Sequence, residues 1–178
     1  LKRCKTSIST PIFSIWKYSL DTGFIDKKYK TQLVTPVFKK GSRGSPENYR
    51  PIALTSHIIK VFERVMRKRL VDHLEDNNLL CNNQHGFRQG RSCLTQLLAH
   101  FDDILCNSLE GADTDAIYLD FAKAFDKVDH QLLLKKLKAF GVTGKVFQWI
   151  ESFLLDRDQY VAVNGVKSSV SKVISGVP

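Results

Sequence analysis

The chain has 178 residues, of which 43% are hydrophobic, so it is long enough to bury the core of one ordinary domain or two small ones. It carries 27 Lys and Arg against 18 Asp and Glu, and the resulting net charge of +9 favours a polyanionic partner. No apolar run approaches the roughly 20 residues that span a bilayer, and no secretory signal precedes the cysteines, so we expect neither a membrane span nor a disulfide framework. We predict an intracellular protein of the cytoplasm and nucleus with reduced thiols. A merely soluble basic protein is the alternative that the charge leaves open.

The chain shows no internal repeat and no Gly/Ser-rich linker that would divide it into independent domains. It begins with Leu1 rather than with an initiator methionine, and Pro178 lies in the middle of a motif. We therefore expect the sequence to be an excerpt of a longer polypeptide. The spacing of Cys81, His85 and Cys93 fits no common zinc finger, so we expect no zinc site there.

The first third of the chain predicts a helix and then two strand arms. Thr10 and Pro11 are typical of an N-cap and a first helical residue, and Gly23 ends the helical stripe. Residues 32–38 (QLVTPVF) and 48–54 (NYRPIAL) are predicted as the arms of a hairpin, which a basic loop connects.

Three cations of this hairpin are candidates for phosphate binding. Lys39 and Lys40 begin the loop, and Arg50 lies in the second arm. The planar guanidinium of Arg50 can contact two phosphate oxygens at once. From composition alone, a solvated surface loop is the alternative interpretation.

A long helix is predicted to begin at Thr55 or Ser56 and to end at Asn77 and Asn78. Its core face is marked by Ile58, Phe62, Val65, Met66 and Leu70, and its opposite face carries Lys60, Arg64, Arg67 and Lys68. A basic helical face can follow the phosphates of a nucleic acid. It can equally be a solvated surface.

The loop at residues 81–93 (CNNQHGFRQGRSC) is rich in polar and turn-forming residues. Its candidates for nucleic-acid contact are two glycines that permit close backbone approach and three polar or basic side chains, namely Gly86, Gly90, Gln84, Arg88 and Arg91. Phe87 is predicted to anchor the loop by packing beneath the glycines. Ser92 is predicted to cap the next helix, whose inward face would contain Leu94, Leu97, Leu98, Phe101, Ile104 and Leu105.

The stretch 116–130 (AIYLDFAKAFDKVDH) combines a strand pattern with carboxylates. Ile117 and Leu119 alternate with Tyr118 and Asp120, as expected of a strand with one buried face that delivers the Asp120 carboxylate at its end. Such a carboxylate can hold a divalent cation beside a pocket. The alternative is a turn or cap residue, and downstream aspartates could likewise cap the helix expected at 129–140.

The last third predicts two helices and a hairpin. The helix over 129–140 ends at Gly141, and Thr143 caps a second one with a strongly apolar face. Asn164 and Gly165 separate two strand patterns, and this pair supplies the positive φ values of a tight hairpin turn. The chain then ends in Ser-Gly-Val-Pro.

Four of these stretches resemble motifs of the reverse transcriptases of the non-LTR (LINE-type) retrotransposon class, and along the chain they occur in the order found in that family. They are DFAKAFDKVDH at 120–130, PVFKKG with NYRPIAL at 36–54, Q-x-G-F-R-x-G-x-S at 84–92 and the terminal S-G-V-P. The resemblance implies an α+β fold, the fingers and partial palm of a right-hand polymerase, with an incomplete antiparallel palm sheet backed by helices. Residues 1–30 would be a helical lead-in, 31–110 fingers with some palm helix, and 111–178 the first half of the palm.

The resemblance also implies the chemistry of an RNA-directed DNA polymerase, in which a primer hydroxyl attacks a deoxynucleoside triphosphate on an RNA or DNA template. Asp120 would be the catalytic carboxylate and, with the Phe121 carbonyl, a ligand of two Mg²⁺ ions, for which Mn²⁺ is an alternative. Lys39 or Lys40 and Arg50 would meet the triphosphate. Phe125 would lie under the sugar and exclude a 2′-hydroxyl, whereas Asp126 matches the motif without a clear role.

Two ions need more than one carboxylate, and the family's downstream Tyr-x-Asp-Asp turn does not occur in these 178 residues. We therefore expect this excerpt alone to be inactive. The sequence leaves two other interpretations open: a non-catalytic nucleic-acid-binding module, and a reverse transcriptase of a group II intron or retron. The predicted partners are template, primer and deoxynucleoside triphosphates, with no membrane.

Overall fold

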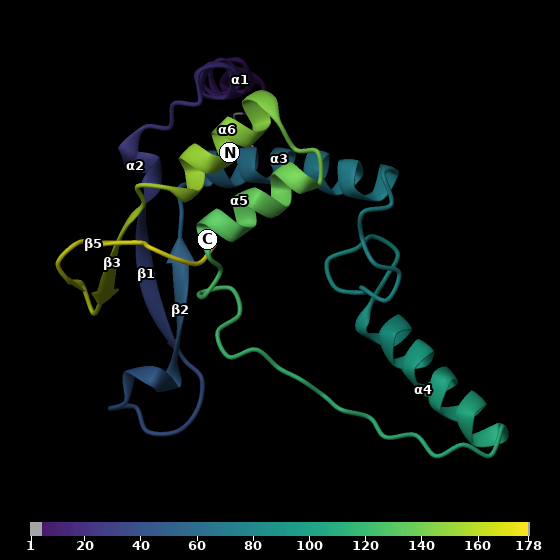
Figure 1. Cartoon of the computed structure of the whole chain (residues 1–178). Coiled ribbons are helices and arrows are strands. Elements are labelled where there is room, and N and C mark those ends of the chain that lie inside the picture. The colour runs from purple at the N-terminus through teal and green to yellow at the C-terminus, as the bar shows by residue number, and fades with distance from the viewer. Residues whose placement is uncertain (1–4, 178) are drawn as a thin grey trace. The chain divides into compact units, whose positions relative to one another are not determined.

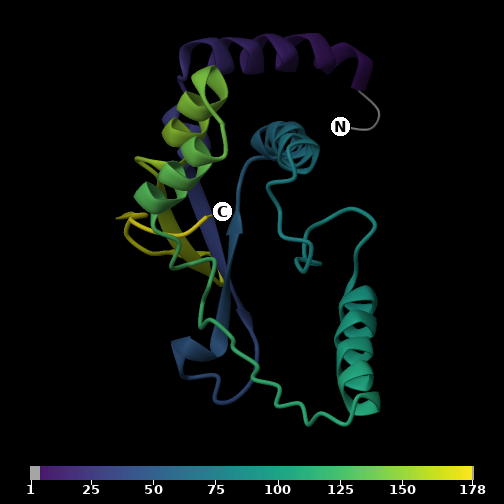
Figure 2. The same ribbon diagram turned by 45° about the vertical axis from the view of Figure 1, so that its right-hand side comes forward.

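A computed structural model describes residues 5–177, which form two compact units. The first unit combines the residues up to Val65 with those from Lys123 onward, and the second contains Met66–Ala122. Figures 1 and 2 show the elements of each unit. The helices are α1 (Lys5–Thr22), α2 (Lys27–Lys30), α3 (His57–Asp76), α4 (Cys93–Leu109), α5 (His130–Ala139) and α6 (Gly144–Leu154), with a 3-10 turn η2 (Pro46–Asn48). The strands are β1 (Thr31–Phe38), β2 (Tyr49–Leu54), β3 (Asp158–Val163), β4 (Val166–Lys167) and β5 (Ser171–Lys172).

The sheet of the first unit has the order β2-β1-β3-β4, and β5 also pairs with β3. β1 and β2 form the predicted antiparallel hairpin, in which Val37 lies opposite Arg50. The expectation of an antiparallel sheet is wrong in one pairing, because β1 and β3 run parallel with Thr31 opposite Asp158. The helices between β1 and β3 supply the long crossover that parallel strands require. The result is a small mixed sheet within an α+β fold.

The core of the first unit lies among α1, the first half of α3, and α6. Trp149 on α6 is only 2% exposed, and its ring meets that of Phe62 edge-on at a centroid distance of 4.7 Å. Trp16 of α1 stacks on the Phe62 ring at a centroid distance of 5.1 Å. The Trp149 indole donates to the Ser19 hydroxyl at 3.0 Å, so the one polar atom of this large side chain has a partner. The predicted apolar face of α6 is therefore confirmed as core.

Most predicted helix and turn boundaries are confirmed, the helix starts by hydrogen bonds and the hairpin turn by its backbone angles. Ser92 and Thr95 form a capping box at the start of α4, and the Asp129 carboxylate accepts from the Leu132 amide at the start of α5. Asn164 and Gly165 both have positive φ, as the hairpin turn requires. One boundary is wrong: α1 already includes Lys5, and Pro11 lies inside it. The turns before Pro11 are largely exposed, so a carbonyl that loses its amide partner there can be hydrated.

The strand predicted before Asp120 and the buried face predicted for α4, both in the second unit, are wrong. Residues 112–121 form no strand, and Ile117 and Leu119 are 84% and 88% exposed rather than alternately buried. A strand exists only with a hydrogen-bonded partner, and no described strand pairs with this segment. The predicted inward face of α4 is also mostly exposed, with Leu98 at 61%. An apolar stripe becomes core only where another element covers it.

Among the helices of residues 5–177, none combines the length and the apolar character needed to cross a membrane.

Asp158 links three elements of the first unit. It starts β3, its side chain is 7% exposed, and its carboxylate lies 3.0 Å from Lys172 of β5 and 3.2 Å from Lys27 of α2. Hydrogen bonds from Lys172 and then Lys27 hold the pKa of Asp158 below its ordinary value. The contact with Asp158 likewise raises the pKa of Lys172.

We expect this depressed pKa to make the first unit acid-sensitive. The stabilisation is present above the pKa of an unfolded aspartate, about 3.9, and is lost as pH falls through the lower folded value. Asp158→Asn should therefore lower stability at pH 7 and flatten the acid limb of an unfolding midpoint measured against pH. Asp113→Asn, which removes an exposed carboxylate of the second unit, is the control. An unchanged acid limb in Asp158→Asn would contradict this assignment.

Candidate functional site

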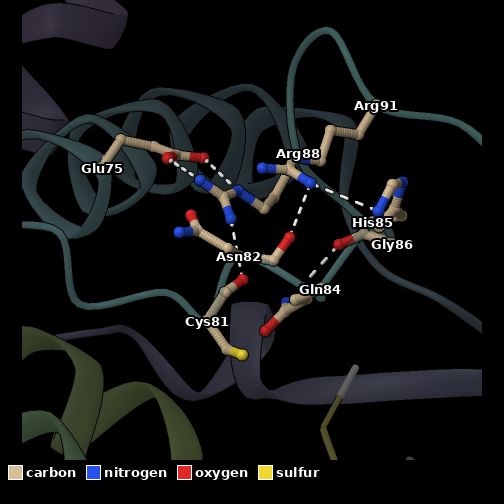
Figure 3. A network of polar contacts seen from close by, with 8 residues as sticks. All are labelled: Glu75, Cys81, Asn82, Gln84, His85, Gly86, Arg88 and Arg91. Carbon is tan, nitrogen blue, oxygen red and sulfur yellow. Dashed lines mark hydrogen bonds and ion pairs between the residues drawn. The ribbon is translucent and has the colours of Figure 1, made fainter. Parts of the chain in front are cut away.

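The loop between α3 and α4 is organised by one ion pair (Figure 3). The guanidinium of Arg88 binds both carboxylate oxygens of Glu75, at 2.9 Å through Nε and at 2.6 Å through Nη2. Its Nη1 donates to the Cys81 carbonyl at 2.9 Å. The pair lowers the pKa of Glu75 and raises that of Arg88, chiefly through the hydrogen bond between them. Because the Arg88 side chain is only 12% exposed, these contacts shape the loop.

The other polar residues of the loop surround this pair (Figure 3). Arg91 donates to the Asn82 carbonyl at 2.6 Å and lies 3.2 Å from the His85 ring. Gln84 makes a long 3.5 Å contact to the Gly86 carbonyl. The backbone is open at Gly86, where a Cβ would meet nothing within 4 Å. This network leaves the glycine positions accessible on an ordered loop.

The prediction that Phe87 anchors the loop is wrong. Phe87 is 75% exposed and has a φ of 63°. The loop is held from within by charged hydrogen bonds to Arg88, and these contacts need no apolar anchor. Gly90, with a φ of 73° and open space around it, supplies a second left-handed turn position.

The basic row on α3 consists of Lys60, Arg64, Arg67 and Lys68. All of these residues are exposed, and their spacing places them on one side of the helix. Lys68 forms a 2.8 Å ion pair with Asp72, one turn further along α3. Exposed cations in a row can contact successive phosphates.

The tip of the β1–β2 hairpin carries the predicted triphosphate-binding cations. Lys39 and Lys40 follow β1 directly and are exposed, and the Lys39 amide donates to the Asn48 carbonyl at 2.8 Å. Arg50 is exposed on β2. The hairpin therefore presents all three side chains to solvent at one end of the sheet.

A pocket of about 560 Å³ lies on the first unit, next to the β2 residues that follow Arg50. Pro51 and Ile52 line it together with Phe125 and Asp126 from the segment before α5. The remaining lining comes from β1, β3 and the chain after β5, namely Gln32, Val34, Ala53, Arg157, Gln159, Val161, Lys172, Val173, Ile174, Ser175, Gly176 and Val177. The fold thus brings residues of two predicted motifs, NYRPIAL at 48–54 and DFAKAFDKVDH at 120–130, to one pocket.

Arg157 is a pocket residue that the sequence analysis missed. It is 3% exposed, donates to the Gln32 side chain, and lies over the Phe153 ring at 6.0 Å. Burial lowers the pKa of Arg157, and burial also raises the pKa of Glu63 on α3. No periodicity marks a buried arginine, so only the packing of β3 against β1 identifies it. Ser175, Gly176 and Val177 also line the pocket; the sequence places them in a motif but predicts none of their contacts.

Asp120 and Phe121 belong to the second unit, whereas Phe125 and Asp126 belong to the first. Both Asp120 and Phe121 are exposed, the latter at 83%. Within residues 5–177, no group of three or more His, Cys, Asp or Glu side chains is arranged to hold a metal ion. The described part of the chain thus contains no such group around Asp120.

We expect Arg88→Ala to loosen the loop, because it removes both bonds to Glu75 and the bond to Cys81. Hydrogen exchange of the Gln84 amide, which bonds to the Cys81 carbonyl at 3.0 Å, should accelerate. The charge-reversed double variant Glu75→Arg/Arg88→Glu should recover part of the protection. Lys68→Ala, which removes an exposed ion pair, is the control and should leave the loop unchanged. Equal exchange in Arg88→Ala and the parent chain would refute an organising role.

Comparison with known proteins assigns the chain to a family. The family model described as reverse transcriptase (RNA-dependent DNA polymerase) matches residues 37–178. The probable RNA-directed DNA polymerase from transposon BS of Drosophila melanogaster is 33% identical, with 92% of this chain and 18% of that protein covered. The probable RNA-directed DNA polymerase from transposon X-element of the same organism is 31% identical, with coverages of 85% and 17%. The RNA-directed DNA polymerase from its mobile element jockey is 29% identical, with coverages of 92% and 18%.

The chain thus spans less than a fifth of the length of these relatives. The resemblance that its motifs indicated is confirmed, with homologues among the polymerases of non-LTR retrotransposons. The chain belongs to the reverse transcriptase family of RNA-dependent DNA polymerases.

Proposed function

We propose that the chain is the fingers and the first part of the palm of an RNA-directed DNA polymerase of a non-LTR retrotransposon. Residues 31–110 would be fingers with some palm helix, and residues from 111 would be palm. The observation that carries this proposal is the pocket in which Phe125 and Asp126 meet the residues that directly follow Arg50. A nucleotide site needs a sugar-contacting surface and phosphate-binding cations at neighbouring positions.

The proposed nucleotide site uses both halves of the first unit. Arg50, with Lys39 or Lys40, would neutralise the triphosphate, for which an exposed guanidinium on a strand is well suited. Phe125 would lie against the deoxyribose and leave no room for a 2′-hydroxyl, so that ribonucleotides are rejected. The proximity of Phe125 to Pro51 and Ile52 around one pocket supports this assignment.

Asp120 is the proposed catalytic carboxylate, and the Phe121 carbonyl a second oxygen ligand. When bound, Mg²⁺ would make the primer hydroxyl a stronger nucleophile and stabilise the negative charge of the leaving pyrophosphate. A single carboxylate does not offset two divalent ions, and residues 5–177 contain no metal-binding cluster. Asp120 therefore contributes one ligand to a site whose other carboxylates must come from elsewhere in a complete polymerase.

Template and primer are the proposed partners of the basic row on α3 and of the loop 81–93. Lys60, Arg64 and Arg67 would contact phosphates, together with Lys68. In the loop, Arg91, Gln84 and the open backbone at Gly86 would approach the nucleic acid. Arg88 would act differently, because its guanidinium is engaged by Glu75 and Cys81 and is nearly covered. We assign it the role of holding the loop in shape.

The 178-residue chain alone is expected to be inactive, because it offers one proposed metal-binding carboxylate. Primer extension with Mg²⁺, an RNA template and all four deoxynucleoside triphosphates should give no product above the level without protein. Filter binding of the same template–primer should nevertheless show affinity that falls with rising salt, as phosphate contacts require. Clear incorporation of nucleotides by this chain would overturn the expectation.

The decisive test places this segment within a complete polymerase polypeptide. Asp120→Asn should lower the rate of incorporation by roughly 10³-fold or more, since several kcal/mol of charge stabilisation are lost. Template affinity should stay within about twofold, because the substitution removes no phosphate contact. Asp113→Asn is the control for loss of a nearby exposed carboxylate. A purely nucleic-acid-binding module would instead be indifferent to nucleotide and Mg²⁺, and an active Asp120→Asn variant would reject the proposed role.

A further inference from the structure

The residues after β5 form a strap, Ser175–Val177, that is bonded to the segment carrying Phe125. The Val177 amide donates to the Phe125 carbonyl at 3.1 Å, and the Gly176 amide donates to the Val128 carbonyl at 2.8 Å. The Ser175 hydroxyl donates to the Asp126 carbonyl at 3.0 Å. In Figure 1 the yellow end of the chain accordingly reaches the beginning of α5. The strap therefore fixes the backbone of residues 125–128 at successive positions.

Gly176 is required for this close approach. Its φ is +84°, and a Cβ at this position would lie 2.9 Å from the Asp126 carbonyl oxygen and 3.0 Å from the Asp126 Cα. Both atoms belong to the backbone, so removing this steric clash would require the strap or the 125–128 segment to move. Any L side chain would meet a strained φ and a clash together.

His130 forms a further hydrogen bond to the strap. This first residue of α5 is 6% exposed, and its Nε2 lies 2.8 Å from the Gly176 carbonyl oxygen. A carbonyl oxygen only accepts, so Nε2 carries the hydrogen. The preceding residue, Asp129, caps α5 and thereby fixes the start of the helix from which His130 projects. His130 thus attaches the strap to a rigid element.

We propose that His130 and Gly176 are positioning residues that set the place of Phe125 and, through it, the discrimination between deoxyribonucleotides and ribonucleotides. This inference rests on the proposed function, in which Phe125 excludes the 2′-hydroxyl. Phe125 lines the pocket, and its side chain is 61% exposed. Its backbone is held by the strap, and a shift of about 1 Å at that backbone moves the ring enough to admit an extra oxygen.

The contact itself can be tested in the 178-residue chain. His130→Leu and Gly176→Ala should accelerate hydrogen exchange at the Gly176 and Val177 amides by roughly tenfold or more, since the bonds to Val128 and Phe125 weaken. His130→Gln, whose amide can still donate, should retain part of the protection. Gly111→Ala is the matched control, because its φ is +75° but nothing lies within 4 Å of the added Cβ. Unchanged exchange in His130→Leu and Gly176→Ala would overturn the strap.

Discrimination is measured in a complete polymerase that carries this segment, as the ratio of kcat/KM for a deoxyribonucleotide to that for its ribonucleotide. His130→Leu and Gly176→Ala should lower this ratio roughly tenfold, mainly through a lower KM for the ribonucleotide. Ser175→Ala removes only the hydrogen bond to the Asp126 carbonyl and introduces no clash, so it should lower this ratio less. Because this variant is expected to fold normally, it keeps the inference testable if the other two variants misfold. His57→Leu, at an exposed histidine, should leave the ratio unchanged.

Phe125→Val separates the two proposals. If Phe125→Val abolishes discrimination while His130→Leu, Gly176→Ala and Ser175→Ala leave the ratio within twofold of the parent, the positioning inference fails and the proposed role of Phe125 stands. If Phe125→Val leaves the ratio unchanged, the proposed role of Phe125 fails, and the positioning inference fails with it. A graded loss of discrimination across all four variants supports both.

Discussion

The parallel pairing of β1 with β3 is the contact on which the first unit depends. Four residue pairs, from Thr31–Asp158 to Val34–Val161, join the N-terminal hairpin to the last third of the chain. Without this pairing, β2 and the segment around Phe125 would have no common pocket. It also places Asp158 where Lys27 and Lys172 both reach its carboxylate. A single strand contact of long sequence separation therefore assembles the sheet, the pocket and a charged cluster.

The strap and the Arg88 ion pair illustrate two ways of holding a loop in place. In the second unit, a bidentate pair between Arg88 and Glu75 organises the loop from within its own sequence neighbourhood. In the first unit, backbone atoms some 50 residues apart along the chain are joined, and Gly176 permits the approach that any side chain would block. The Arg88 guanidinium bonds to one backbone atom, the Cys81 carbonyl, in addition to Glu75, whereas the strap bonds to backbone atoms of residues 125, 126 and 128.

The failed predictions of burial for residues 117–119 and for α4 share one physical cause. Ile117 and Leu119 have the alternation of a strand, and α4 has the apolar stripe of a packed helix, yet Ile117, Leu119 and most of the α4 stripe are exposed. Periodicity shows which face an element would bury, but burial requires a partner surface. No described strand pairs with residues 112–121, so this segment forms no strand despite its alternating pattern. For the same reason, Asp120 is identified by its motif rather than by a formed site.

The sequence by itself determined the family, through four motifs in order, and most local structure: the cap Ser92, the hairpin turn at Asn164–Gly165, and the apolar face of α6. These features are local, because each is decided by side chains within a few residues of one another. Only the tertiary structure decided the parallel pairing of β1 and β3, the burial of Arg157, the engagement of Arg88, and the contact of His130 with Gly176. The pairing of β1 with β3 and the contact of His130 with Gly176 are long-range, and each depends on which elements of the chain pack together. Periodicity carries no information on that choice, since it describes one element at a time.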